Sequence, residues 1–279
     1  MARRVDGIGV VYENGGIVNT DPLMIDFLNQ QGISIFEIDV DRERFAGFFL
    51  NGAYSFKEKY IFNGTARYDG SNRLGKSNDA RWLPTWNVSG AWNVDRESFF
   101  NIWWLDYLKL RATYGLTANL GPNTSALLNL RSDVTLRPTD VETYLYIEAL
   151  ENSDLTWEKL LEFNAGFHFG AFKNRISGTV DFYKRNSFDL IGVIQTSGVG
   201  GNAFKFGNYA DMTSQGFEVA INTLNLTIND FTWSTNFNVG YTHDRITRLD
   251  FNPRIADAIA QGGAAVQGGP RRGLFSTKY

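Results

Sequence analysis

Eight stretches of this sequence alternate, residue by residue, between an apolar side without charges and a polar side. In residues 60–69, Tyr60, Phe62 and Tyr68 share one side, while Arg67 and Asp69 lie on the other. Successive side chains of a β-strand point to opposite faces, so a period of two predicts a strand with one apolar face. The pattern recurs in residues 48–56, 86–94, 108–114, 161–169, 175–185, 217–222 and 231–242. We therefore predict an all-β chain of about eight antiparallel strands.

The placement of aromatic residues indicates which solvent the apolar face meets. A soluble antiparallel sheet also hides one apolar face, so a soluble β-sandwich or propeller is the alternative. Eight residues span roughly 26 Å, or about 20 Å of height once tilted, which nearly fills the apolar band of a bilayer. Aromatic residues lie near both ends of the apolar side, as interfacial girdles do, in the pairs Tyr60/Tyr68, Trp86/Trp92 and Trp233/Tyr241. These features favour a transmembrane β-barrel segment.

The connections between the predicted strands alternate between short and long. Those around residues 57–59, 171–174 and 225–230 are short, whereas those after residues 69, 116 and 186 are long. Barrels in the outer membrane have short periplasmic turns and longer external loops, so we assign the short turns to the periplasmic rim. The connection over residues 117–157 shows no clear period and is predicted to be a long external loop. The connection over residues 95–106 is longer than a typical periplasmic turn.

Composition excludes several classes of function. With 27 basic and 30 acidic residues, the near-neutral charge argues against nucleic acid as a partner. The chain has no cysteine, so it can form neither a disulfide framework nor a thiolate metal site. We expect three parts: residues 1–43 as a loop or the end of a preceding hairpin, residues 44–243 as barrel strands with long external loops, and residues 244–279 as an external loop leading into a missing strand.

The two ends suggest that the sequence belongs to a longer protein. Residues 1–6 contain two arginines but no apolar run behind them, so they do not form a secretory signal. An outer-membrane protein needs such a signal, and the last residues follow directly on the loop-like stretch 261–273. We therefore expect an internal piece of a larger barrel, or else a truncated product without independent function.

Short motifs follow the predicted strands in a fixed order. They are KY and RYDGSNRLG within residues 59–75, LKLRATYG at 108–115, NSDLTWE at 152–158, NRISGTVDFY at 174–183, DLI at 189–191, Asn208 with SQGFE at 214–218, FTWSTNFN at 231–238, and the stretch from Gly269-Pro270 to Tyr279. In kind and order they resemble the motifs of the SusC/RagA-like TonB-dependent outer-membrane transporters. The resemblance is nearly continuous from Arg44 to the end of the sequence.

The resemblance implies a barrel of about 22 strands around an internal plug. It implies import of glycan oligosaccharides or peptides across the cell outer membrane, with energy from the TonB complex and a SusD-like lipoprotein as a surface lid. The plug and the closing strands would lie outside this sequence. The departures from the family pattern are WLP at residues 82–84, TAN at 117–119 and SQG at 214–216, where FPS, TGN and NKG are usual. They concern subfamily and substrate rather than fold.

Sites for metal or phosphate chemistry find little support. His168 and His243 lie on different predicted strands without a second ligand at metal spacing, so we interpret them as polar lumen or rim residues. Asp39, Asp41 and Glu43 have the spacing of a calcium loop, but an arginine follows where glycine is required, and a solvated loop is expected. Residues 198–203 fit a loose G-x-G-x-x-A pattern without the helix that a phosphate site needs. We predict no catalytic, cofactor or metal site, and no enzyme.

Aromatic and charged residues supply the candidates for ligand contact. Phe204, Phe206 and Tyr209 are expected in a long external loop, where aromatic faces could stack on sugars. Trp103, Trp104 and Tyr107 precede a strand on the predicted periplasmic side, where anchoring in the interfacial belt is the better account. The predicted polar sides carry Arg67, Arg111, Arg175 and Glu218, which would line the lumen or touch the plug.

Two functions are compatible with these observations. The first is import of a large nutrient, an oligosaccharide or peptide, through an outer-membrane barrel of which this chain is a part. The second is a soluble or cell-surface β-rich module that binds carbohydrate without a membrane.

Overall fold

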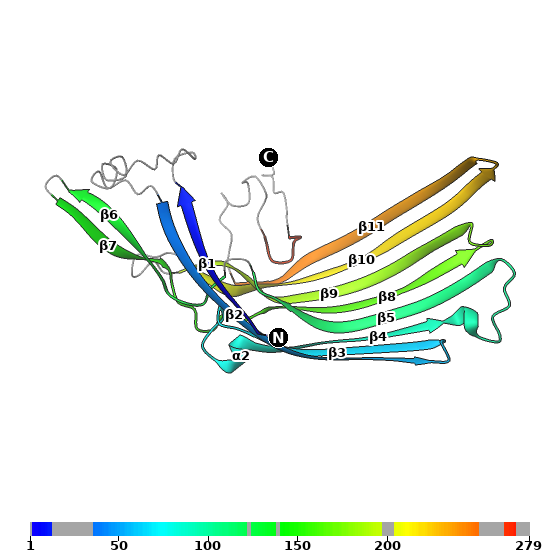
Figure 1. The fold of residues 1–279 in the computed structure, drawn as a ribbon, viewed down its shortest axis with the longest axis horizontal. Coiled ribbons are helices and arrows are strands. Elements are labelled where there is room, and N and C mark those ends of the chain that lie inside the picture. The colour runs from blue at the N-terminus through cyan, green and yellow to red at the C-terminus, as the bar shows by residue number, and fades with distance from the viewer. Residues whose placement is uncertain are drawn as a thin grey trace.

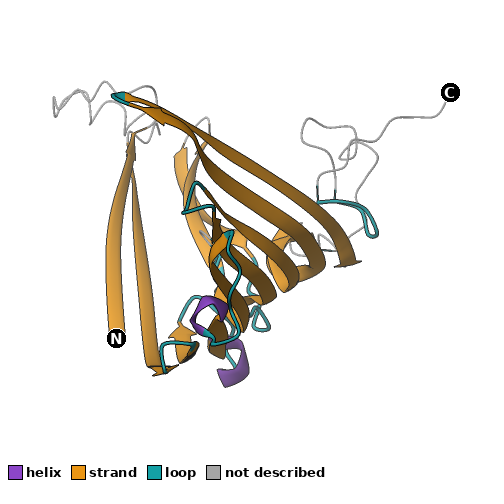
Figure 2. Ribbon diagram, turned by 90° about the vertical axis from the view of Figure 1, so that its right-hand side faces the viewer, coloured by secondary structure: helices purple, strands orange, loops and turns teal. Residues whose placement is uncertain are grey.

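A computed structural model describes residues 2–12, 36–121, 124–137, 140–196, 204–250 and 265–271. These residues form almost exclusively antiparallel β-structure, with one nine-stranded sheet in the order β1-β2-β3-β4-β5-β8-β9-β10-β11 and a separate two-stranded sheet, β6-β7. The strands of the large sheet lie side by side as one curved wall (Figures 1 and 2). The wall is open over the described residues, because β1 and β11 are its edges and do not pair with each other.

All eight predicted stretches fall on strands of the large sheet, so the predicted all-β antiparallel fold is confirmed. The strands are β1 (Ala2–Tyr12), β2 (Phe36–Phe56), β3 (Tyr60–Ser71), β4 (Trp82–Asn93), β5 (Leu105–Asn119), β8 (Glu158–Ala171), β9 (Ile176–Gln195), β10 (Phe204–Ile228) and β11 (Phe231–Leu249). Strands β6 (Asn129–Arg137) and β7 (Asp140–Ala149) form the small sheet. Two short helices are present, α2 (Asn78–Arg81) and the 3-10 turn η1 (Val94–Arg96).

The three predicted short turns are confirmed, and each contains residues with left-handed backbone. Positive φ angles occur at Lys57 and Glu58 between β2 and β3, at three residues between β8 and β9, and at Asn229 between β10 and β11. Such turns match the right-handed twist of paired strands, which lets the chain reverse over very few residues. All three turns lie at one end of the wall, whereas α2 and the β6-β7 hairpin lie at the other (Figure 1). We call these ends the turn rim and the loop rim.

Three expectations about loops need correction, and all three concern the loop rim. The predicted long connection over residues 117–157 does join β5 to β8, but it contains the β6-β7 hairpin. Asp39, Asp41 and Glu43 lie in β2 rather than in a solvated loop, and β10 begins as early as Phe204. Strand β2 has 21 residues and β10 has 25, about twice the 9–11 residues that cross a bilayer core. Beyond that length nothing requires an uncharged face, so backbone pairing continues where the alternation of the sequence stops.

Register shows that the apolar residues form a band that crosses the strands obliquely. The row that contains Tyr241 on β11 passes through Phe217 and Phe182 and reaches Tyr54 on β2. On β11 this row is the last apolar one before the loop rim, whereas on β2 the apolar residues continue for six more positions to Phe48. The border thus shifts by about 20 Å along the strands over about 34 Å across them, a tilt of roughly 30°. Strands that close into a barrel must tilt in this manner.

A small buried core lies at the loop rim, and separate sequence motifs build it. Leu74 and Leu155 are fully buried there beside Ala126 and Trp157. The backbone of Gly75 donates a 2.9 Å hydrogen bond to the Leu155 carbonyl oxygen, and the Trp157 indole donates one of 3.0 Å to the carbonyl oxygen of Arg81. The motifs RYDGSNRLG and NSDLTWE, far apart in the chain, are therefore directly in contact.

Arg73 fastens a third segment to this core. Its Nε donates to the Thr124 carbonyl oxygen at 2.8 Å, and its Nη1 forms a 2.7 Å ion pair with Glu43. Both partners of this ion pair are largely buried, with 15% and 22% of their side chains exposed. The arginine of the RYDGSNRLG motif thus ties β2 and the segment before β6 to the core.

We predict that Leu155→Ala loosens the loop rim without unfolding the wall. Truncating a fully buried leucine costs about 2–5 kcal/mol, and here the loss falls on a core away from the long β-ladders. Limited proteolysis of the full-length protein should cut faster within residues 121–128, with no new cuts in the strands. Leu127→Ala, at a side chain that is 48% exposed, is the matched control. Equal cutting rates in both variants would contradict the prediction.

Candidate functional site

The candidate site is the wall itself, which has two faces of opposite character. Side chains of opposed strands share a face, so the register assigns each residue to one side. We call the side with Phe62, Phe182 and Tyr241 the apolar face, and the side with Arg111 and Asp181 the polar face. On the apolar face, large side chains are open to the surroundings, for example Leu50 at 75% and Trp233 at 56%. An exposed apolar surface of this extent requires an apolar environment or a covering partner.

On the polar face, an ion pair spans three strands across a glycine. Arg111 on β5, Gly166 on β8 and Asp181 on β9 are direct neighbours in register. The Arg111 guanidinium donates to both carboxylate oxygens of Asp181 at 2.6 Å. A Cβ at Gly166 would collide with the Asp181 carboxylate and come within 2.5 Å of the Val180 carbonyl oxygen. Glycine is therefore required for this contact.

Tyr183 makes a similar contact across a glycine, two residues along β9 from Asp181 toward the loop rim. Tyr183 on β9 is 3% exposed and lies over Gly216 on β10, and its hydroxyl shares a 2.5 Å hydrogen bond with Thr242 on β11. The aromatic ring covers backbone that the glycine leaves bare, an arrangement known to stabilise sheets. The Arg185 guanidinium lies 4.2 Å from the centre of the Tyr183 ring and donates to Glu162 at 2.8 Å.

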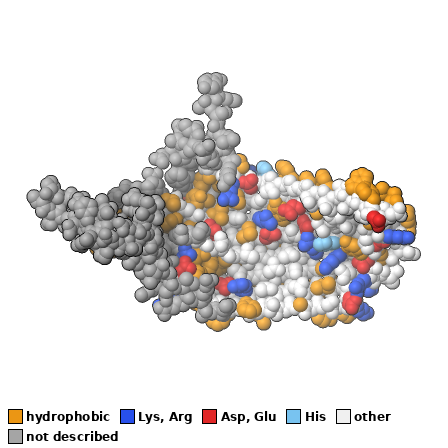
Figure 3. Space-filling model, turned by 45° about the horizontal axis from the view of Figure 1, so that its top comes forward, with side chains coloured by type: hydrophobic (Ala, Val, Ile, Leu, Met, Phe, Trp, Pro, Cys, Tyr) orange, Lys and Arg blue, Asp and Glu red, His pale blue; other side chains and the backbone are white. Residues whose placement is uncertain are grey.

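Several charges on the polar face are thus paired with one another. Figure 3 shows a face of the sheet on which basic and acidic side chains are interspersed among uncharged ones. Exposed ion pairs contribute little to stability, but they leave a wall rich in hydrogen-bonding groups without a strong net field. Such a surface suits contact with polar solutes or a polar protein domain.

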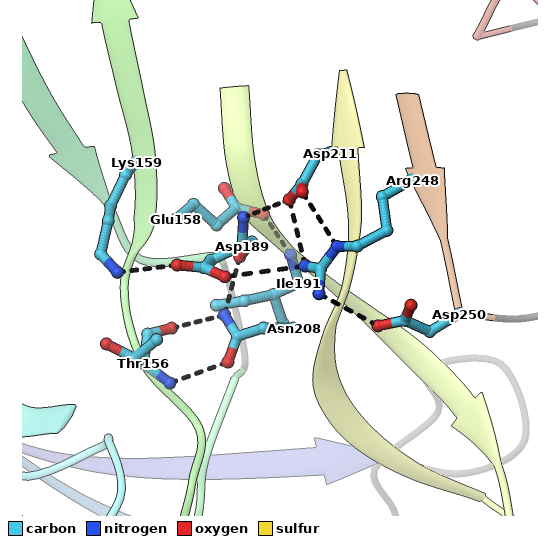
Figure 4. A network of polar contacts seen from close by, with 9 residues as sticks. All are labelled: Thr156, Glu158, Lys159, Asp189, Ile191, Asn208, Asp211, Arg248 and Asp250. Carbon is cyan, nitrogen blue, oxygen red and sulfur yellow. Dashed lines mark hydrogen bonds and ion pairs between the residues drawn. The ribbon is translucent and has the colours of Figure 1, made fainter. Parts of the chain in front are cut away.

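A network of polar contacts holds β9, β10 and β11 together near the loop rim (Figure 4). Arg248 is at its centre, with nitrogen–oxygen distances of 2.9 Å to Asp211, 3.3 Å to Asp250 and 3.7 Å to Asp189. Asp189 also forms a 2.7 Å ion pair with Lys159 on β8. Four strands are thereby connected through two cations.

Asp189 and Asn208 mark a bulge in this part of the sheet. Asp189 has a φ of 57°, and the β9-β10 register shifts on both sides of Ala210. The amide of Asn208 donates to the Asp189 carbonyl oxygen at 2.7 Å and to the Thr156 carbonyl oxygen at 2.8 Å. Side chains at this bulge therefore satisfy the backbone groups that the interrupted ladder leaves free.

A second polar cluster lies at the turn rim, around Glu97 in the connection that follows η1. Its carboxylate accepts hydrogen bonds from Lys59 at 2.8 Å, from the Tyr60 hydroxyl at 2.7 Å and from the Trp92 indole at 3.1 Å. These donors, with Lys59 the largest contributor, lower the pKa of Glu97 from 4.5 to about 2. The irregular connection over residues 95–106 is thus attached to β3 and β4.

The predicted aromatic ligand contacts do not lie in a loop. Phe204, Phe206 and Tyr209 belong to β10, and the Phe206 carbonyl oxygen accepts a 2.7 Å hydrogen bond from Asn152. The Tyr209 ring covers Gly192 on β9, where a Cβ would come within 2.8 Å of the ring. Strand pairing extends beyond the alternating part of the sequence, so the expectation of a loop is wrong for these residues. Their contact with a ligand stays a prediction.

Most of the other aromatic and charged candidates have structural partners. Phe172 in the β8-β9 turn lies with its ring centre 6.3 Å from that of Trp103 and 6.2 Å from that of Trp104, so both lie at the turn rim. Trp103 is 88% exposed, as an interfacial anchor would be. The Tyr107 ring covers Gly170, and Arg67 forms an ion pair with Asp69 at 3.1 Å. Arg175 donates a hydrogen bond of 2.8 Å to the Asn225 carbonyl oxygen. Glu218 lies opposite Asp181 in the register.

The histidines lie apart, on different strands and faces. His168 is opposite Lys109 on the polar face, and His243 is exposed on β11 beside Gln215. Among the described residues, no group of three or more His, Cys, Asp or Glu side chains could hold a metal ion. Residues 198–203, the loose glycine-rich pattern, lie outside the described part of the chain.

The surface of the wall has several hollows. One, of about 690 Å³, lies on the apolar face where Gly52, Gly64 and Gly90 leave space beside Phe62 and Tyr114. A neighbouring hollow of about 540 Å³ lies beside Leu50 and Trp86. Another, of about 350 Å³, is lined by Asn93, Asp95, Arg96, Tyr107, Lys109 and His168 near the turn rim. In the described residues no helix is long and apolar enough to cross a membrane.

Comparison with known proteins agrees with this architecture. The family model described as "TonB dependent receptor-like, beta-barrel" matches residues 7–275. The chain is 30% identical over 234 residues to the TonB-dependent receptor SusC of Bacteroides thetaiotaomicron, and 30% identical over 203 residues to the TonB-dependent receptor P3 of Formosa agariphila. These alignments cover 79% and 70% of this chain, but 23% and 20% of the relatives. The chain therefore spans about a quarter of the length of the curated relatives it matches.

Solved structures match a similar share of this chain. The RagAB peptide importer in its closed-closed state matches with a TM-score of 0.71 and 25% identity, over 80% of this chain and 24% of that one. Its open-open state matches with a TM-score of 0.66 and 29% identity, over 79% of this chain and 24% of that one.

We predict that Gly166→Ala destabilises the folded full-length protein by about 1–3 kcal/mol, the usual cost of overpacking. The added methyl group has no room between Arg111 and Asp181. Gly64→Ala is the matched control, because a Cβ there meets nothing within 4 Å. The temperature at which the folded form loses its compact electrophoretic mobility measures the effect. A larger loss in Gly64→Ala than in Gly166→Ala would refute the assignment.

A pH dependence follows from the depressed pKa of Glu97. A carboxyl with a lower pKa in the folded state contributes stability that is complete above its unfolded pKa, and this is lost as the pH falls through the folded value. Glu97→Gln should therefore lower thermal stability by a constant amount from pH 7 to about 5. Below about pH 4.5 the difference from the wild type should shrink, and near pH 2 it should vanish. A pH-independent difference would contradict this role.

Proposed function

This chain belongs to the TonB-dependent receptor-like β-barrel family, and on that premise we propose that it forms part of the barrel wall of an outer-membrane importer. The apolar face would meet lipid, and the polar face would line the lumen or contact a domain enclosed by the barrel. The observation that carries this proposal is the oblique apolar band, because a band tilted against the strands fits a wall that closes around an axis. The turn rim would face the periplasm and the loop rim the cell exterior.

The proposed cargo is a large nutrient, with an oligosaccharide as the first candidate. The interspersed charges of both signs and the many amide and hydroxyl groups of the polar face suit a neutral, hydrogen-bonding solute. A peptide is the second candidate, favoured by the similarity to structures described as a peptide importer. In either case the protein would bind and translocate its cargo without altering it, so we propose no catalytic step.

Two partners belong to this proposal. A surface lipoprotein of the SusD type would close over the loop rim, and the TonB complex would supply energy from the periplasmic side. Support for the lipoprotein comes from the similarity to SusC and to the RagAB peptide importer. The β6-β7 hairpin, which projects at the loop rim (Figure 1), would lie on the side of such a lid.

Growth of a strain that lacks the full-length gene tests the function. We expect the deletion to abolish growth on one class of oligosaccharide or peptide, while growth on the corresponding monosaccharide or amino acids persists. Small monomers diffuse through general pores, so only the large solute should depend on the receptor. Restoring the full-length gene should restore growth, and depletion of TonB should abolish it again.

The controls separate the alternatives. Wild-type growth of the deletion strain on every large carbon and nitrogen source tested would refute the import function. Recovery of the full-length protein in the soluble fraction, without detergent, would favour the carbohydrate-binding module instead. Growth on oligosaccharides and growth on peptides are scored separately, which decides between the two cargo classes.

A further inference from the structure

Three basic side chains border the apolar band on the apolar face of β9 and β11. In register, Lys184 on β9, Gln215 on β10 and His243 on β11 form one row, and Arg245 follows two residues after His243. This row lies one step toward the loop rim from the aromatic row of Phe182, Phe217 and Tyr241. We call Lys184, Gln215, His243 and Arg245 the basic strip.

The orientation of the basic strip follows from its neighbours. Tyr183 is buried on the polar face and bonds Thr242 there, so the adjacent Lys184 and His243 point to the opposite side. All four side chains of the strip are exposed. They thus stand on the same side as the lipid-facing aromatic residues, just beyond the apolar border.

No carboxylate of the described residues neutralises the charges of the basic strip. Within the described part of the chain, neither Lys184 nor Arg245 forms an ion pair with a carboxylate, in contrast to Arg111 and Arg185 on the polar face. Thr213, between Asn186 and Arg245, adds only a hydroxyl. The next carboxylate along β10, Asp211, is already bound to Arg248 at 2.9 Å.

We propose that the basic strip binds the phosphorylated headgroup of a lipid in the outer leaflet of the membrane. Opposed residues of neighbouring strands are about 5 Å apart, so Lys184 and His243 would flank a phosphate across a gap of roughly 10 Å. Gln215 would donate a hydrogen bond from below, and the acyl chains would lie on Phe217 and Tyr241. Cations next to an interfacial aromatic belt attract anionic headgroups electrostatically. This inference rests on the proposed membrane location but not on import.

Lipid binding to the purified full-length receptor tests the proposal. The receptor, in an uncharged detergent, is titrated with monophosphoryl lipid A, and bound lipid is counted by native mass spectrometry. Phosphatidylcholine serves as the lipid without net charge. In the double variant Lys184→Gln with Arg245→Gln, we expect the affinity for monophosphoryl lipid A to fall about tenfold or more, with little change for phosphatidylcholine.

The matched control is Lys57→Gln with Lys173→Gln, which removes two charges from exposed positions at the turn rim. It should bind monophosphoryl lipid A like the wild type. Equal affinity of both double variants for monophosphoryl lipid A would overturn the proposal. Displacement of the lipid by millimolar inorganic phosphate would also overturn it and would assign the strip to free phosphate. Because the titration contains no cargo, failed growth in the import test would not affect it.

Discussion

The antiparallel backbone ladder is the interaction on which the rest of this structure depends. It sets which side chains stand opposite one another, and hence which residues form the apolar and polar faces. A slip of one residue on β9 alone would carry Asp181 and Tyr183 to the apolar face and leave Arg111 without its partner. The tight turns at Lys57, Asn174 and Asn229 keep that register in place. A buried apolar core plays only a local part, at the loop rim.

Two glycines allow side-chain contacts that span three strands of the polar face. A side chain reaches the strand beyond its neighbour more easily where the strand between carries no Cβ. Arg111 over Gly166 and Tyr183 over Gly216 both meet this condition. The resulting contacts tie the wall laterally, in the direction in which the lumen would open. The Arg111–Asp181 contact also pairs opposite charges on that face, whereas no carboxylate among the described residues pairs with Lys184 or Arg245 on the other face.

The loop rim brings several motifs together that are distant along the chain. RYDGSNRLG, NSDLTWE, DLI and Asn208 have no common chemistry, yet they meet at one small core and at the polar network beside it. Their shared role is to hold loops against strands that continue past the apolar band. A rim ordered in this way would give the β6-β7 hairpin a firm base.

The sequence by itself determined eight of the strands, their two faces and the short turns, because alternation and turn residues act over a few neighbouring positions. It predicted Arg111 on the polar face but not its partner, since Asp181 is 70 positions away and meets it only through the ladder. The sequence also did not predict the extension of β10 to Phe204, the β6-β7 hairpin or the bulge at Asp189. Outside the apolar band no solvent imposes a period, so there the pairing partners alone decide the structure. Only the tertiary register could place Lys184, His243 and Arg245 together at the border of the apolar band.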